Sequence, residues 1–178
     1  MAQYDATSIY VYQAYRPAIA TYAVRHQQFG GEFSFSRMSW IKPNFLWMMF
    51  RSGWATKEGQ ERILAVRLYR SFFDELLHAA VASSFAASGY ATQQEWRARV
   101  EQSEVRLQWD PDHDPTGNVV ERRAIQLGLR GEMLKRYAQL EVVSIEDITE
   151  FVTEQREHAA GDFSSLVIPE ERPYIHSC

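Results

Sequence analysis

The segment from Arg37 to Trp54 concentrates the residues best suited to bind an anion. It reads RMSWIKPNFLWMMFRSGW and joins three cations to three tryptophans within eighteen residues. Guanidinium and ammonium groups form charge-assisted hydrogen bonds with phosphate or carboxylate, and indole rings stack on nucleobases or on nicotinamide. A nucleotide would use both kinds of group. The ligand-binding residues predicted in this segment are Arg37, Trp40, Lys42, Trp47 and Arg51.

The same segment also fits a purely structural interpretation. Its apolar residues, such as Phe45 and Met48, are typical of a core segment whose tryptophans are enclosed and whose cations extend outward to water. Burial of the three cations without partners would be costly, which favours a ligand role for them. A third interpretation makes the tryptophans and methionines an exposed surface for a protein partner.

A second group of polar residues lies at the end of an aromatic segment, YVYQAYR, at residues 10–16. Polar side chains at the end of a strand are placed to hold the amide or the ribose of a ligand. We therefore predict that Gln13, Tyr15 and Arg16 belong to the site. Alternating aromatics in a strand are also typical of a core, and this alternative stays open.

A third group lies in QLGLRGE, residues 126–132, where two glycines permit close approach of other groups to the backbone. Glu132 either belongs to the site or begins a helix and complements its dipole. A separate acidic turn contains Asp110, Asp112, His113 and Asp114, but its spacing is not that of a calcium loop. We expect no metal site.

Periodicity predicts the elements that must position these groups. Alternation of apolar and polar residues predicts strands at residues 8–15, 33–35, 63–69, 105–109, 125–129 and 140–143. Three- and four-residue repeats predict helices at 18–29, 72–81, 133–137 and 145–152, the last beginning at a capping box of Ser144 and Asp147. Strands and helices do not alternate regularly, which favours an α+β fold with mixed or antiparallel sheets packed with helices.

Length and composition predict one domain over residues 1–178, with 159–178 as an irregular tail. The chain is 46% apolar, enough to close one core. Its net charge is −4, yet residues 37–70 hold seven basic and two acidic side chains. A basic region on an acidic protein favours a small anionic ligand over a long polyanion.

Cysteine content and hydropathy bear on location. The only cysteine is Cys178, so no intramolecular disulfide forms and a reducing compartment, the cytoplasm, is expected. The first residues lack a basic region followed by an apolar run, and the longest apolar stretch, Phe45 to Phe50, is too short to span a bilayer. Neither secretion nor a membrane partner is expected.

Several of these motifs occur together in one family. The segments VYQAYRPAIA, RMSWIKPNFLWMMFRSGWATKEGQERILA, QWDP and IQLGLRGE resemble the domain of unknown function family 4291, from about Tyr4 to Pro173. This resemblance implies a family without an activity.

A looser similarity is to the ADP-ribosyltransferase fold. In that fold an early strand, a helix ending in glycine, an aromatic-serine strand and a late glutamate surround NAD. The resemblance implies that Gln13 and Glu132 are catalytic, that Phe35 and Ser36 stand at the second motif, and that NAD is the substrate. Glu132 would then hydrogen-bond the ribose and stabilise an oxocarbenium-like transition state.

These observations lead to one expected function and two alternatives. We expect an enzyme that acts on a nucleotide or a nucleic-acid end, with NAD-dependent transfer of ADP-ribose as one form. The first alternative is a non-catalytic sensor of a nucleotide or small anion. The second is the protein-interaction module described above. The sequence leaves the oligomeric state open.

Overall fold

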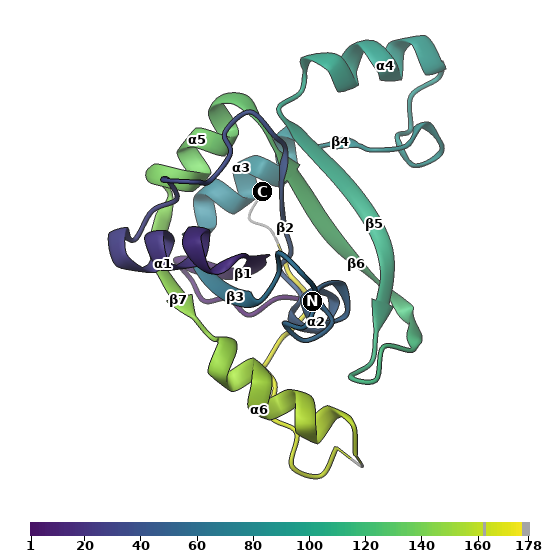
Figure 1. The fold of residues 1–178 in the computed structure, drawn as a ribbon. Coiled ribbons are helices and arrows are strands. Elements are labelled where there is room, and N and C mark those ends of the chain that lie inside the picture. The colour runs from purple at the N-terminus through teal and green to yellow at the C-terminus, as the bar shows by residue number, and fades with distance from the viewer. Residues whose placement is uncertain (162, 176–178) are drawn as a thin grey trace.

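Two β-sheets frame the fold (Figure 1). The computed structural model describes residues 1–161 and 163–175. The first sheet is antiparallel, in the order β1-β3-β7, and is built from β1 (Ser8–Tyr15), β3 (Arg62–Tyr69) and β7 (Val142–Asp147). The second has the order β2-β6-β5-β4 and is built from β2 (Ser39–Ile41), β6 (Val119–Leu129), β5 (Val105–His113) and β4 (Val81–Ala82). Only the β4–β5 pair is parallel, so this sheet is mixed.

Six α-helices in the described residues accompany the sheets. They are α1 (Pro17–His26), α2 (Phe45–Ser52), α3 (Arg70–Ala79), α4 (Gln93–Gln102), α5 (Gly131–Gln139) and α6 (Thr149–Ala159), with a 3-10 turn at Phe85–Ala87. In Figure 1, α1, α3 and α5 lie on one side of the first sheet, α6 lies at its far end, and α4 projects beyond the long β5–β6 hairpin. The predicted α+β class is confirmed: this is a single domain of mixed and antiparallel sheets with helices.

The first sheet is buried on both faces. In β3, Leu64, Val66 and Leu68 face the main core, which also receives side chains from α1, α3, α5 and the second sheet. Ile63 and Ala65 face a second cluster formed with α2 and α6. Successive side chains of a strand point to opposite faces, so one strand supplies both clusters. The end of β1 therefore lies between two packed layers, and α2 is held against its outer face.

Several predicted elements and boundaries are wrong, and the strand at 39–41 and the helices at 45–52 and 93–102 were not predicted. Residues 33–35 do not form a strand, because Phe33 turns into an aromatic cluster with Tyr15 and Phe29. β5 does not end at Trp109 but continues to His113. The capping box at Ser144 does not form either, since this residue pairs with Arg67 inside β7, and α6 starts only at Thr149.

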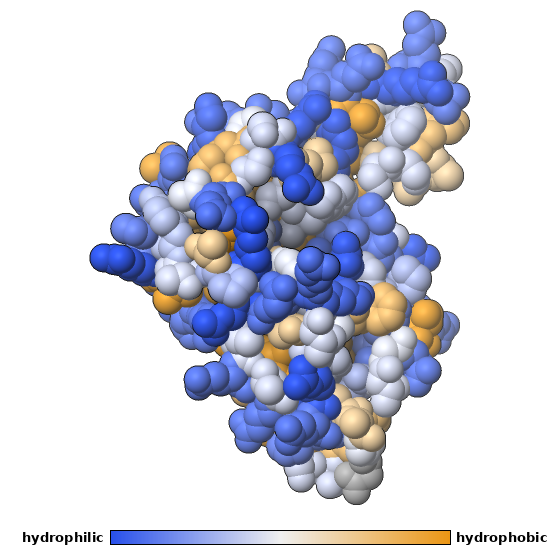
Figure 2. Space-filling view, viewed as in Figure 1, coloured by the Kyte–Doolittle hydropathy of each residue, from blue (hydrophilic) through white to orange (hydrophobic). Residues whose placement is uncertain are grey.

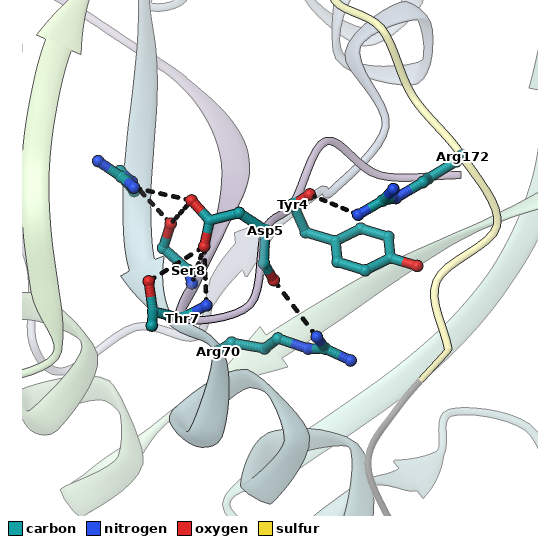
Figure 3. Close-up of polar contacts among 7 residues, drawn as sticks. Tyr4, Asp5, Thr7, Ser8, Arg70 and Arg172 are labelled. Carbon is teal, nitrogen blue, oxygen red and sulfur yellow. Dashed lines mark hydrogen bonds and ion pairs between the residues drawn. The ribbon is translucent and has the colours of Figure 1, made fainter.

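The two terminal segments are tied to each other and to β1 (Figure 3). Asp5 closes a tight turn before β1, and its carboxylate accepts a hydrogen bond from the Ser8 amide at 2.7 Å. Arg70 donates to the backbone oxygen of Asp5 at 3.3 Å, and Arg172 donates to that of Tyr4 at 3.1 Å. These contacts fix the start of the strand whose other end carries Gln13 to Arg16.

The predicted tail follows α6. Its described residues, 160–161 and 163–175, contain no strand or helix apart from one bridge between Ala2 and Arg172; positions 162 and 176–178 lie outside the described residues. Nowhere in the described chain is a helix both long and apolar enough for a membrane crossing.

Candidate functional site

A cavity of about 560 Å³ opens between the end of β1, the loop after α1, β2 and the last turn of α2. Seven of the predicted site residues line it: Gln13, Tyr15, Arg16, Arg37, Trp40, Lys42 and Arg51. Figure 2 shows a hollow near the middle of this face, with hydrophilic residues around it. The fold thus gathers groups from two segments, residues 13–16 and 37–51, around one cavity.

Lys42 is the most unusual residue of the cavity. Its backbone is fixed to β1, because the Tyr12 amide donates to the Lys42 oxygen at 2.7 Å and the Lys42 amide donates to the Tyr12 oxygen at 3.3 Å. The residue is only 5% exposed, yet its side chain has no ion pair or hydrogen bond within the described part of the protein. An unpaired buried ammonium costs several kcal/mol.

Burial, together with the positive charge of Arg51, lowers the pKa of Lys42 to about 8. The nearby carboxylate of Asp110 acts in the opposite direction. That carboxylate is already engaged, because it accepts hydrogen bonds from the side-chain amides of Gln108 at 2.8 Å and Gln126 at 2.9 Å. The Lys42 amine therefore meets the cavity without an anionic partner.

Two further cations at the cavity are also uncommitted. The Arg37 and Arg51 side chains are exposed and form no ion pair or hydrogen bond with any residue that the structure describes. Arg16 differs, since it pairs with Glu32 at 2.7 Å, with both side chains more than half exposed. Three cations without carboxylate partners share one cavity, which is the electrostatic arrangement of an anion site.

Local capping explains how α2 presents Arg51. Asn44 begins the helix, and its side-chain oxygen accepts a hydrogen bond from the Trp47 amide at 2.7 Å. The Glu171 carboxylate, from the tail, accepts a hydrogen bond from the Phe45 amide at 2.6 Å. Gly53, with φ of 60°, ends the helix in the left-handed conformation that glycine adopts without strain. This short helix is held at both ends with Arg51 in its last turn.

A hydrogen-bonded network forms the polar wall of the cavity. The Gln13 amide nitrogen donates to Ser39 Oγ at 2.9 Å and to the Trp40 carbonyl at 3.1 Å, while its oxygen accepts from the Tyr137 hydroxyl at 2.5 Å. Ser39 and Tyr15 share a further hydrogen bond of 2.9 Å. Gln13 is 3% exposed and uses all its donors here, so its role is to orient its neighbours.

The Ser39–Tyr15 pair leaves one hydroxyl hydrogen over. The two hydroxyls contain two hydrogens, and the bond between them uses one. Both residues line the cavity, so the second hydrogen is available to an acceptor there. Burial raises the pKa of the Tyr15 hydroxyl above its ordinary value, so it remains a neutral donor. Ser39 had no signal of its own in the sequence, because only the β1–β2 contact places it beside Gln13.

Trp40 forms the aromatic wall and depends on Gly128. The two residues are paired across β2 and β6. A β-carbon at position 128 would lie 3.0 Å from the Trp40 ring and 2.6 Å from Met38 Sδ. The close approach predicted for this glycine motif is therefore present, and the group that approaches is the Trp40 indole.

Trp47 does not line the cavity. It is 7% exposed and stacks on His113, with ring centroids 5.3 Å apart, while Phe50 stacks on the same histidine at 3.6 Å. We call Trp47, Phe50 and His113 the aromatic stack. On α2, Met48 and Arg51 share the face toward the cavity, and Trp47 and Phe50 share the next face. Trp47 therefore has no ligand to stack on in this cavity.

Glu132 also lies away from the cavity. It occupies the first turn of α5, its side chain is 66% exposed, and it pairs with Lys135 at 3.5 Å. This position matches the alternative that the glutamate begins a helix and complements its dipole. Ser36, expected at the second motif, bonds to Ser34 in the loop and does not line the cavity.

The acidic turn is internally satisfied. Asp112 pairs with Arg122 at 2.6 Å, and Asp114 accepts hydrogen bonds from Thr116 and Asn118. No cluster of three or more potential metal ligands forms in the described residues.

Comparison with known proteins gives a family and no activity. No curated protein matches the chain in sequence. The family model described as Domain of unknown function (DUF4291) matches residues 1–174, nearly the whole chain. The chain therefore belongs to the DUF4291 family.

Proposed function

We propose that this protein binds a nucleotide through its phosphates in the Lys42 cavity and acts as an enzyme on a nucleotide or nucleic-acid end. The observation that carries the proposal is Lys42, a 5% exposed cation that faces a cavity without a partner in the described chain. A bound phosphate would supply the missing negative charge and offset the cost of burial.

The other walls suit the remaining parts of a nucleotide. Arg37 and Arg51 extend the positive region toward solvent, where further phosphate oxygens would lie. Trp40 offers a ring for stacking on a base, and the Ser39–Tyr15 pair offers a donor for a ribose oxygen. A volume of about 560 Å³ falls within the usual range for small-molecule sites.

Cleavage of NAD at its nicotinamide bond is the reaction implied by the looser resemblance. Within this proposal the Gln13 network orients the ribose, and Glu132 takes no part because it lies outside the cavity. We place the activity in the cytoplasm, where nucleotides are plentiful and a lone cysteine stays reduced.

One observation favours a non-catalytic nucleotide sensor as the second candidate. Among the described lining residues the single carboxylate is Glu32, and Arg16 already neutralises it. A cavity with cations and hydroxyls but no free carboxylate has no obvious general base.

Fluorescence titration tests the proposal. Trp40 lines the cavity, so ATP, NAD, ADP-ribose or a short 5′-phosphorylated RNA should change the emission, and Trp40→Phe should remove that change. Lys42→Met should weaken binding at least about tenfold, or about 1.4 kcal/mol. Lys135→Met is the matched control, because it makes the same change on exposed α5.

The outcomes separate the candidates. Binding with release of free nicotinamide from NAD supports the enzyme, and binding without turnover of any of the four supports the sensor. No change in emission with any of the four ligands would contradict the assignment of the cavity as a nucleotide site. An equal loss of affinity in Lys42→Met and Lys135→Met would contradict it as well.

A further inference from the structure

The three lysines of this chain lie in two very different environments. Lys57 and Lys135 are exposed; Lys57 bonds to backbone oxygens at the end of α2, and Lys135 pairs with Glu132. Lys42 is buried at the cavity with no carboxylate to hold its proton. This contrast concerns reactivity as well as binding, because a lysine is a nucleophile only as the neutral amine.

Two features of the cavity favour the neutral amine of Lys42. Burial removes the water that stabilises an ammonium ion, and Arg51 adds a second positive charge nearby. With a pKa of about 8, about one tenth of the Lys42 side chains are neutral at pH 7. For a lysine with the ordinary pKa of 10.5, the fraction is about one in three thousand.

We propose that Lys42 forms an imine with a nucleotide whose sugar has a free anomeric carbon, of which ADP-ribose is the simplest example. The proposal rests on the proposed function and gives Lys42 a second role in the same cavity. With ADP-ribose, the Arg37 and Arg51 side chains hold the phosphates and the neutral amine reaches the sugar; with a nucleotide that has no free anomeric carbon, the ammonium form binds phosphate. A desolvated lysine beside a second cation is the environment that activates an amine for carbonyl chemistry.

The step is balanced without a co-reactant. The Lys42 nitrogen adds to the aldehyde carbon of the ring-opened sugar, and a carbon–nitrogen bond forms. The carbonyl oxygen leaves as water and takes both hydrogens of the neutral amine, which leaves a carbon–nitrogen double bond. The hydroxyl hydrogen left over at the Ser39–Tyr15 pair donates a hydrogen bond to the departing oxygen and stays on the hydroxyl at the end of the step.

Reductive trapping with peptide mass spectrometry tests the proposal. The intact protein is incubated at pH 7 with ADP-ribose and cyanoborohydride, which reduces an imine to a stable secondary amine. We expect the adduct on Lys42 to form at least about tenfold faster than on Lys57 or Lys135, which serve as internal standards. ADP, which has no free anomeric carbon, should slow labelling by competition. Lys42→Arg should abolish it while retaining a charge for binding.

Each result has a defined meaning. Preferential labelling of Lys42 that ADP suppresses supports the imine. Equal labelling of all three lysines, or ADP-ribose binding in the fluorescence titration without a Lys42 adduct, overturns the imine and leaves the nucleotide site standing. Absence of both binding and adduct overturns the proposed function as well.

Discussion

The two faces of α2 differ in the polar groups that they hold and in how those groups are exposed. Toward the cavity, the helix presents Arg51 beside Lys42, and the charges remain open to a ligand. Toward β5, the aromatic stack encloses Trp47 Nε1 and His113 Nδ1, neither of which has a partner among described atoms. A buried polar atom without a partner costs far less than a buried charge, and stacking offsets part of that cost. We therefore expect one face of α2 to contribute to stability and the other to serve the proposed binding.

The largest expected effect on stability concerns the face of α2 that packs toward β5. Trp47→Ala should lower the free energy of unfolding by about 3–5 kcal/mol, because a buried indole leaves a cavity between Phe50 and His113. Trp40→Ala, on the half-buried cavity wall, should cost less than about 2 kcal/mol but weaken ligand binding. Urea denaturation measures both. Equal destabilisation by the two variants would contradict the proposed difference between the two faces of α2.

The next effect concerns the charge of Lys42. Its pKa is lowered to about 8 in the fold, so the folded state disfavours the ammonium. The resulting cost in folding free energy is fully present below pH 8 and shrinks as the pH rises. It vanishes above about pH 10.5, where the amine is neutral in both the folded and the unfolded state. Without ligand, Lys42→Met should therefore be more stable than the wild type at pH 7, by up to about 3 kcal/mol, and lose this advantage by pH 11.

Paired urea denaturation curves of the two proteins at pH 7 and pH 10 check the sign, because groups common to both cancel in the difference. Lys135→Met provides the control and should show no such trend. A Lys42→Met protein that is less stable than the wild type at both pH values would mean that this lysine supports the fold and does not await a ligand.

Ligand binding should depend on pH through the same residue. Phosphate favours the protonated amine, so affinity for ADP should fall above pH 8, by up to about tenfold per pH unit. Lys42→Arg should flatten the profile, since guanidinium keeps its proton throughout this range. Titrations between pH 7 and pH 9.5 measure the slope. An identical slope in the wild type and the arginine variant would remove Lys42 from the phosphate site.

The smallest effect sharpens the description of the cavity wall. Gly128→Ala places a methyl group 3.0 Å from the Trp40 ring and 2.6 Å from Met38 Sδ, which must both shift. We expect a stability loss of about 1 kcal/mol, at the low end for overpacking because Met38 is flexible. We also expect weaker nucleotide binding through the displaced indole. Retained nucleotide affinity together with unchanged Trp40 fluorescence would show that Gly128 does not determine the position of the Trp40 indole.

Local signals in the sequence predicted only part of the cavity wall: β1 was predicted, whereas β2 and α2 were not. Alternation in β1 brings Gln13 and Tyr15 to the cavity, and Asn44 and Gly53 bound α2 as caps that can be recognised without a structure. Helix α4 begins at a capping box of Thr92 and Glu95, a signal present in the sequence, but this exposed helix buries no residue and has no apolar stripe, so periodicity does not predict it.

Long-range contacts explain what the sequence could not show. Phe33 alternates like a strand residue but belongs to an aromatic cluster, and the position of Trp47 depends on His113, sixty-six residues later in the chain. Ser39 and Tyr137 join the Gln13 network only when β1, β2 and α5 meet. Residue type alone therefore indicated anion binding by the tryptophan segment, and tertiary packing decided which members reach the cavity.

A crystal structure of the protein with ADP-ribose would show whether the Lys42 cavity is the nucleotide site. We expect a phosphate oxygen or the sugar C1 atom in direct contact with Lys42 Nζ, and the remaining phosphate oxygens at Arg37 and Arg51. Density for the ligand at another surface, with the Lys42 cavity filled only by water, would contradict this expectation.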